Sequence, residues 1–293
     1  MCALRTVAAD AGPRNSCSLR TLCHDDGVPG TLVSFHAHPD DETILTGGTI
    51  ARAADDGHRV VLVFATRGDN GEVADGFLAP SEALADRRQA EARRAAEILG
   101  AARVEFLGYG DSGMVDTETN NAPGSFWSAN VDDAARELAV ILDEEDADVL
   151  TTYDERGGYG HPDHIQAHRA GVRAAQLAQT PRLYAATVSR QHFLSVARDQ
   201  FVEMSGEAAP PNPDDFDLGV DESRITTTVD VSGVIDRKRA AMAAHASQIG
   251  EESFFLQLPE DAFLRTFGTE WFIRLDRTPP RPETWLFDES APA

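Results

Sequence analysis

The chain has 293 residues, a length that allows one large domain or two small ones. It carries 26 Lys and Arg against 49 Asp and Glu, a formal net charge of −23 that repels nucleic-acid phosphates and anionic lipids and argues against either as a partner. The hydrophobic fraction of 42% excludes a disordered chain, and no run reaches the roughly 18 consecutive apolar residues that a membrane-spanning helix needs.

The first 30 residues differ from the rest. They show no hydrophobic periodicity and contain the turn-forming pairs Gly12-Pro13 and Pro29-Gly30, so we expect residues 1–30 to form a flexible N-terminal arm. The only cysteines, Cys2, Cys17 and Cys23, stand in this segment, which excludes a disulfide framework for the fold. The segment also lacks the basic-then-apolar pattern of a secretory signal, and we therefore expect a cytoplasmic protein.

From residue 31 onward, apolar strand-like runs alternate with amphipathic helical stretches. The expected strands are 31–36, 59–65, 103–107, 148–152 and 182–189, and the expected helices are 43–56, 81–99, 130–145 and 163–176. Ser81 is the expected N-cap of the second helix, and Gly100 follows its end. Such alternation is typical of parallel strands joined by crossover helices. We therefore expect an α/β fold over residues 31–190: a Rossmann-like, open, mainly parallel sheet in the order 3-2-1-4-5, with helices on both faces.

Residues 191–293 are less regular. We expect a loop at 210–215, a strand at 226–231, a helix at 236–248 and a proline-rich tail from Pro279 that wraps the surface. This C-terminal region is expected to complete the substrate pocket.

Two segments rich in histidine and aspartate follow the first and fourth expected strands. The first is His36-Ala-His38-Pro-Asp-Asp-Glu42, and the second contains His161-Pro-Asp-His164. In the predicted strand order these two strands are neighbours, and ligands of open α/β sheets bind at the carboxyl edge where the strand order reverses. The two segments should therefore face one crevice.

The spacing within these segments predicts a metal site. With Pro39 as the first residue of a helix, His38 and Asp41 project to the same side, and His164 supplies a third ligand. Two imidazoles and a carboxylate suit one Zn²⁺ per chain, with Fe²⁺ as the other metal considered, and leave a position open for water. Asp40 points elsewhere and stays free to act as a general base.

Each half of this constellation has a simpler explanation when taken alone. A single His-Pro-Asp or Asp-Asp pair at the start of a helix is usually a capping arrangement, and only the recurrence at one sheet edge favours a metal site. Five other histidines are expected to be strand, surface, packing or satisfied core residues: His36, His58, His168, His192 and His245.

These motifs resemble those of the LmbE/PIG-L family of zinc-dependent de-N-acetylases. The resemblance covers about residues 31–190 and the segment Ala244-His-Ala-Ser-Gln248. It implies a Rossmann-like fold and hydrolysis of an N-acyl, usually N-acetyl, amide on an amino-sugar conjugate, a small-molecule substrate, releasing a carboxylate and a free amine. The resemblance implies the same metal ligands, His38, Asp41 and His164, and the same general base, Asp40, as the spacing does.

The resemblance implies roles for five more side chains. His161 matches the histidine that stabilises the oxyanion or protonates the leaving amine, and Asp163 matches the carboxylate that orients this histidine and should raise its pKa. Tyr159 matches a mobile tyrosine found in those family members that act in mycothiol metabolism. Arg88 and Asp111 match residues that contact the sugar, although a solvated surface charge is an equal alternative for Arg88.

Within the family, the mycothiol-pathway N-acetylglucosaminyl-inositol deacetylase branch is the preferred match. The mycothiol-conjugate amidase branch typically carries a lysine shortly after the first motif, where this chain has Thr43-Ile-Leu-Thr46. That amidase and a natural-product deacetylase of the same family remain alternatives. Outside the family, the alternatives are a two-metal phosphoesterase, a binding module without activity, and a nucleotide-dependent oxidoreductase, which the absence of Gly-x-Gly-x-x-Gly after the first strand disfavours.

Overall fold

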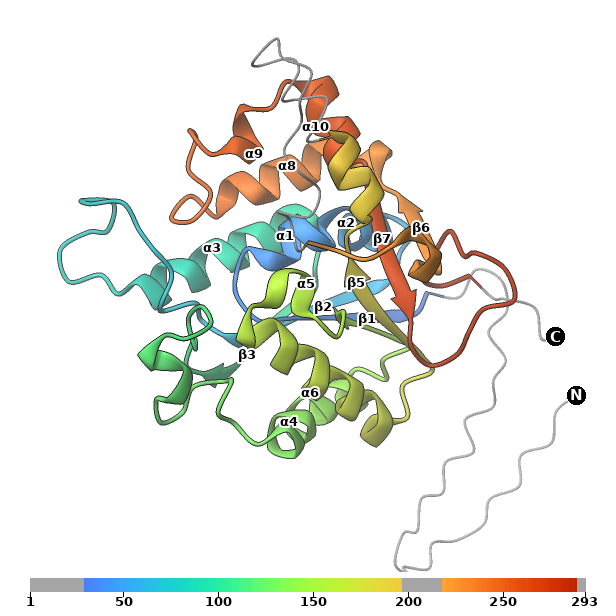
Figure 1. The fold of residues 1–293 in the computed structure, drawn as a ribbon, viewed down its shortest axis with the longest axis horizontal. Helices are drawn as coiled ribbons and strands as arrows, with labels where there is room; N and C mark the ends of the chain where they lie inside the picture. The colour runs from blue at the N-terminus through green and yellow to red at the C-terminus, as the bar shows by residue number, and fades with distance from the viewer. Residues whose placement is uncertain (1–28, 197–217, 289–293) are drawn as a thin grey trace, which may run out of the picture.

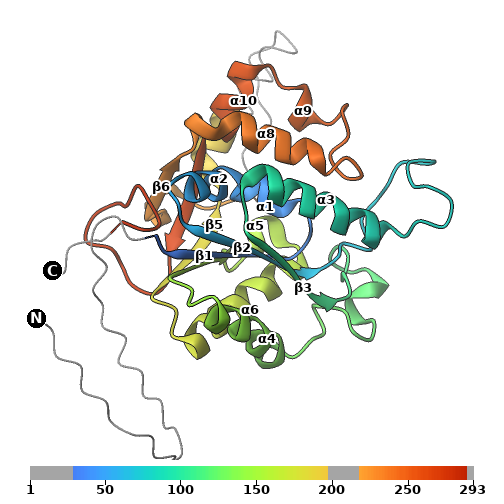
Figure 2. The same cartoon turned by 180° about the vertical axis from the view of Figure 1, so that it is seen from behind.

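The computed structural model describes residues 29–196 and 218–288, and its centre is one seven-stranded sheet covered by helices on both faces (Figures 1 and 2). The three cysteines, nearly all of the expected N-terminal arm and the expected loop at 210–215 lie outside the described residues. No helix in the described ranges is long and apolar enough to cross a membrane.

The sheet has the order β3-β2-β1-β4-β5-β7-β6, so the predicted 3-2-1-4-5 arrangement is confirmed. The first five strands in chain order pair in parallel, whereas β7 pairs antiparallel with both β5 and β6. The strands are β1 Thr31–His36, β2 Arg59–Thr66, β3 Arg103–Tyr109, β4 Val149–Tyr153, β5 Arg182–Thr187, β6 Thr227–Asp230 and β7 Thr269–Arg274. Strand β7, which directly follows a short helix, was not predicted from the sequence.

Apolar side chains on both faces of the central strands explain why both faces carry helices. One layer consists of α4 (Val131–Glu144) and α6 (Pro162–Ala178), whose alanines and leucines pack against Val33 and Phe35 of β1. The opposite layer contains α2 (Gly47–Asp55), α3 (Leu84–Leu99) and α8 (Ile235–Ala244), which pack against the other face of the sheet (Figure 1). Continuous burial on two faces is the pattern expected of parallel strands.

Several predicted helix boundaries are wrong for local reasons. The expected helix at 43–56 is two helices, α1 (Asp41–Leu45) and α2, because Thr46 leaves the helical conformation at φ −135° and ψ 6°. Ser81 is not an N-cap: its φ is +69°, and α3 begins at Leu84. The predicted end of α3 is confirmed, since Gly100 caps it in the left-handed conformation.

The C-terminal region contributes both sheet and helix. Helix α8 ends at Ala244, four residues before the predicted end, and α9 (Phe254–Gln257) and α10 (Glu260–Phe267) follow it. The tail is more than a surface strap, because Trp285 and Leu286 are buried in the core cluster that contains α2 and α3. Other short helices are η1 Glu118–Asn121, α5 Gly157–Gly160, η3 Glu222–Arg224 and η4 Ser232–Val234.

Candidate active site

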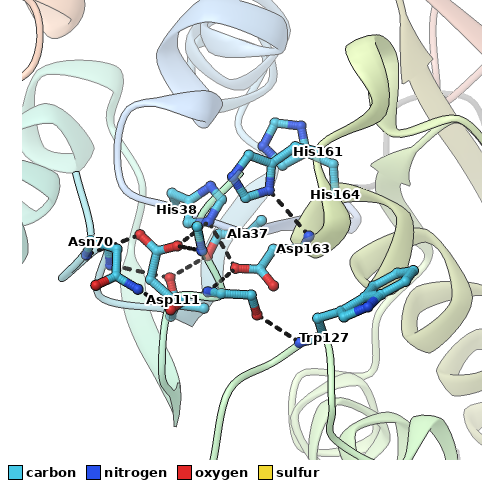
Figure 3. A network of polar contacts seen from close by, with 12 residues as sticks. Ala37, His38, Asn70, Asp111, Trp127, His161, Asp163 and His164 are labelled. Carbon is cyan, nitrogen blue, oxygen red and sulfur yellow. Dashed lines mark hydrogen bonds and ion pairs between the residues drawn. The ribbon is translucent and has the colours of Figure 1, made fainter. Parts of the chain in front are cut away.

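The two histidine–aspartate segments lie against each other at the carboxyl edge of β1 and β4. These strands are neighbours, and each runs straight into its segment. The ring of His38 lies 4.7 Å from that of His161 and 5.3 Å from that of His164, measured between centroids (Figure 3). Residues more than 120 positions apart therefore share one site, as the strand order predicts.

Asp41 lies between two histidine nitrogens. Its Oδ2 atom is 3.4 Å from His38 Nδ1 and 3.4 Å from His164 Nε2. His164 Nδ1 lies 3.1 Å from the carbonyl oxygen of Gly157, to which it donates, so Nε2 keeps a lone pair and has no hydrogen-bond partner among the described residues. Ligand atoms about 2.0–2.1 Å from a tetrahedral Zn²⁺ stand about 3.3–3.4 Å apart, and both distances from Asp41 Oδ2 match that spacing.

The opposite nitrogen of His38 faces two carboxylates. Its Nε2 lies 3.1 Å from Asp163 Oδ2 and 3.5 Å from Asp111 Oδ1 (Figure 3). Although burial lowers the pKa of His38, hydrogen bonds to Asp111 and Asp163 raise it well above its usual value. A histidine that binds metal through one nitrogen commonly donates the other N–H to a carboxylate, and Asp163 and Asp111 occupy that position at His38 Nε2.

The carboxylate of Asp163 was expected to contact and orient the ring of His161, but the structure shows other contacts. The buried carboxylate of Asp163 accepts from Ser112 N–H at 2.9 Å and contacts His38, whereas it is the backbone N–H of Asp163 that donates to His161 Nδ1, at 3.1 Å. His161 is thus the N-cap of α6. Burial, together with the charges of His38 and His164, lowers the pKa of His161 to about 4. The predicted rise is wrong, because Asp163 opposes this shift without reversing it.

Because Nδ1 of His161 accepts a hydrogen bond, we assign the proton of the neutral ring to Nε2. The ring is 4.9 Å from that of His164 and lines the cavity described below. His161 can therefore present an N–H donor to a ligand while staying uncharged at neutral pH.

Asp40 occupies an unusual backbone conformation, with φ 116° and ψ −34°. Helix α1 begins at Asp41, so Pro39 is not its first residue as predicted. The Asp40 carboxylate lies 3.3 Å from Arg88 Nη2, and burial raises its pKa to about 6 despite that cation. Arg88 is only 3% exposed and donates to the carbonyls of Gly68 and Pro39, which rules out a solvated surface charge.

Two further predicted side chains lie at the floor and rim of the site. Asp111 is buried beneath His38, where it accepts hydrogen bonds from the N–H groups of Gly113 and Asn70. Tyr159 is 52% exposed, and its ring lies 5.1 Å from that of His164.

Most of these groups surround one cavity of about 1340 Å³. Of the nine side chains predicted for the site, only Asp163 does not line this cavity, because Asp163 lies behind His38. The C-terminal region contributes further lining residues, among them Lys238, Gln248, Phe254, Phe255 and Trp271. Two groups of buried side chains, His38/His161/His164 and His38/Asp111/Asp163, hold ligand atoms within 4.8 Å of one another. Both include His38, so among the described residues they do not form two independent metal sites.

Two contacts near the site were missed from sequence. Tyr153, one residue beyond the predicted fourth strand, donates its hydroxyl proton to Asp41 Oδ2 at 2.6 Å. Glu42 is fully buried beside Asp41, and its Oε1 lies 2.6 Å from Nε2 of His245, which was expected only as a surface or core histidine. Glu42 belongs to the first histidine–aspartate segment, and this was the sequence feature that could have pointed to it. His168, as expected, packs at the second segment, with Nδ1 2.8 Å from the Tyr153 carbonyl oxygen.

Comparison with known proteins gives the family. The family model described as "PIG-L: GlcNAc-PI de-N-acetylase" matches residues 33–175. The 1D-myo-inositol 2-acetamido-2-deoxy-alpha-D-glucopyranoside deacetylase of Acidothermus cellulolyticus is 41% identical over 263 residues, covering 85% of this chain and 89% of the relative. The protein of the same name from Thermobifida fusca is 40% identical over 270 residues, covering 85% and 94%.

Among solved structures, the N,N'-diacetylchitobiose deacetylase of Pyrococcus horikoshii matches with a TM-score of 0.51 and 24% identity, over 84% of this chain and 83% of that one. This likeness shows a shared fold. The sequence relatives and the family model show that the chain belongs to the PIG-L family of de-N-acetylases.

Proposed function

We propose that this chain hydrolyses the acetamide of 1D-myo-inositol 2-acetamido-2-deoxy-α-D-glucopyranoside, releasing acetate and the free amino sugar. Relatives of about 40% identity over most of the chain carry that activity in their names. The observation that carries the proposal is the position of Asp41 Oδ2 at 3.4 Å from a nitrogen of each of two histidines, inside a cavity large enough for a disaccharide-sized ligand.

The proposed ligands of a single Zn²⁺, with Fe²⁺ as the alternative metal, are His38 Nδ1, Asp41 and His164 Nε2. The unpartnered Nε2 of His164 and the carboxylate behind His38 Nε2 support this set. When bound, the ion polarises the acetyl carbonyl and acidifies water. We prefer Asp41 to His161 as the third ligand because Asp41 Oδ2 lies close to both other ligands. Nδ1 of His161 accepts a hydrogen bond from the backbone of Asp163, which places the proton of the neutral ring on Nε2 and leaves that nitrogen no lone pair for a metal.

Asp40 is the proposed general base. A pKa of about 6 leaves its carboxylate ionised at neutral pH and close enough to neutrality to accept a proton from the attacking water. The same carboxyl group can then deliver that proton to the nitrogen of the breaking C–N bond, so the proton gained in the first step leaves with the amine.

His161 is the proposed oxyanion donor. Because its pKa is lowered to about 4, the neutral ring supplies an Nε2–H hydrogen bond to the negative charge that develops on the acetyl oxygen. Of the two roles that the family resemblance allows, this favours stabilisation of the oxyanion over protonation of the amine. Tyr159, at the rim, is the proposed second donor, and Arg88 and Asp111 are proposed to contact sugar hydroxyls.

The test is amine release by the zinc-loaded protein from three substrates: the inositol conjugate, free N-acetylglucosamine and an amide conjugate of mycothiol. We expect the fastest release from the inositol conjugate. Preferred cleavage of the mycothiol amide would instead support the amidase alternative, and no amine release from any of the three would contradict the proposed function.

A further inference from the structure

The proposed base is held in its unusual backbone conformation by specific groups. A positive φ at a residue other than glycine persists only where the surroundings enforce it. The carbonyl oxygen of Asp40 accepts from Thr43, through the backbone N–H at 3.0 Å and the hydroxyl at 2.8 Å. The N–H of Asp40 donates to Oε2 of Glu42 at 2.8 Å. Both backbone polar groups of Asp40 are therefore fixed.

Glu42 has a second partner from a distant part of the chain. It is 0% exposed, and its other oxygen, Oε1, lies 2.6 Å from Nε2 of His245, which is also 0% exposed and 203 residues away in sequence. His245 directly follows α8 in the C-terminal region. One buried carboxylate thus connects the C-terminal region to the backbone of the proposed base.

The segment that carries His245 also supports the side chain of Asp40. Ser247 donates its N–H and its hydroxyl proton to the carboxylate of Glu91, at 3.0 and 2.6 Å. Glu91 stands three residues after Arg88 on α3, and Arg88 Nη2 lies 3.3 Å from Asp40 Oδ1. The segment therefore contacts both elements that hold Asp40. The next residue, Gln248, lines the cavity.

We propose that Glu42 and His245 are positioning residues: His245 orients Glu42, and Glu42 holds the backbone of Asp40 so that its carboxylate faces the reacting water. This inference rests on the proposed function, in which Asp40 is the base. It assigns a role to the Ala244–Gln248 segment, which the proposed chemistry does not otherwise use. A buried acid–histidine pair is by itself weak evidence that the pair stabilises the fold. This pair contacts Asp40, a residue of the site held at positive φ, and that contact indicates a functional role.

The first experiment measures kcat, KM and bound zinc for variants of the full-length zinc-loaded enzyme. Glu42→Ala should lower kcat on the order of 10²-fold, the effect of misplacing a reacting group by about 1 Å, with KM and zinc content unchanged. Glu42→Asp, which keeps the charge but cannot reach both partners, should also lower kcat. Glu42→Gln should retain most of the activity because its amide oxygen still accepts from Asp40.

His245 is tested in the same assay. His245→Ala should lower kcat, and His245→Gln, whose amide N–H can replace Nε2–H as a donor to Glu42, should restore most of it. The matched control is Glu283→Gln, which alters another buried carboxylate, paired with Arg274 and outside the cavity lining. This control should lower the melting temperature and leave kcat unchanged. A kcat loss in the control equal to that of Glu42→Ala would overturn the positioning role.

A double-mutant cycle separates positioning from a general structural effect. If Glu42 acts only through Asp40, then Asp40→Ala/Glu42→Ala should be no slower than Asp40→Ala alone. A further loss that multiplies the two single effects would overturn the positioning role while leaving Asp40 as the base. A wild-type kcat in Asp40→Ala would instead overturn the assignment of the base, and with it this inference.

Discussion

The Nε2 atom of His164, which has no hydrogen-bond partner among the described residues, lies 3.4 Å from Oδ2 of Asp41. The same carboxylate oxygen is 3.4 Å from Nδ1 of His38 and accepts the hydroxyl proton of Tyr153. A buried nitrogen lone pair beside a carboxylate is costly unless a cation is shared between them. This relationship is the reason to expect a metal ion at the junction of β1 and β4.

The ligand set predicts which variants lose metal. His164→Ala and Asp41→Ala should each bind less than one zinc per chain after dialysis, because each removes a proposed ligand. His161→Ala should keep the zinc, since its proposed task is to donate a hydrogen bond. Metal content by plasma emission checks both. Loss of zinc in His161→Ala with retention in Asp41→Ala would support the three-histidine set instead.

If Asp40 is the general base, its substitution should lower activity without lowering metal binding. Asp40→Ala should lower kcat by about 10²–10⁴-fold, the usual contribution of a general base, with unchanged zinc content. Asp40→Asn should behave in the same way, since an amide cannot accept the proton. If Asp40→Ala were to empty the site, Asp40 rather than Asp41 would be the carboxylate ligand.

The pKa of Asp40 sets the direction of the pH dependence. The base works only when ionised, so kcat should fall as the pH drops through about 6. The positive charge of Arg88 lowers the pKa of Asp40, so Arg88→Met should move this acidic limb to higher pH. The profile should be repeated with Co²⁺, because a limb that moves with the metal and ignores Arg88→Met belongs to water at the metal and not to Asp40.

His161 should act as a neutral donor. With a pKa lowered to about 4, it loses no proton between pH 6 and 9 and should contribute no basic limb. His161→Ala should lower kcat by about 10²–10³-fold, as for other oxyanion donors, and His161→Gln should recover part of it. A basic limb that vanishes in His161→Ala at constant metal content would show an imidazolium acid and contradict this role.

Asp163 should act through His38. Its carboxylate contacts His38 Nε2 at 3.1 Å, so Asp163→Ala should weaken zinc affinity by about 10–100-fold, the usual effect of losing such a partner. Competition with a chromogenic chelator measures this change. Unchanged affinity would show that the contact does not orient the ligand.

The sequence predicts the parts of this molecule that depend on local pattern and strand order. The continuous apolar run of β2 and the motifs that follow β1 and β4 are sufficient to predict the parallel sheet and the shared crevice. Strand β7 was missed because its short run, directly after α10, lies in a region without regular alternation. The break between α1 and α2 at Thr46 and the positive φ of Ser81 are backbone conformations that the residue pattern at these positions does not predict.

Side-chain partners in the site required the structure. The family resemblance suggested Asp163 as the partner of His161, but the first turn of α6 directs the Asp163 carboxylate to His38, 125 residues away. The contact of Glu42 with His245 likewise depends on how α8 packs beside α1. The pKa of His161 follows from burial among other histidines, which a single adjacent carboxylate does not reveal.

The most direct test titrates metal-free protein with Zn²⁺ while measuring amine release from 1D-myo-inositol 2-acetamido-2-deoxy-α-D-glucopyranoside. We predict no release without metal and a linear rise that reaches its maximum at one zinc per chain in the wild type, with no such rise in His164→Ala. Full release by the metal-free protein, or a maximum only at two metal ions per chain, would contradict the account.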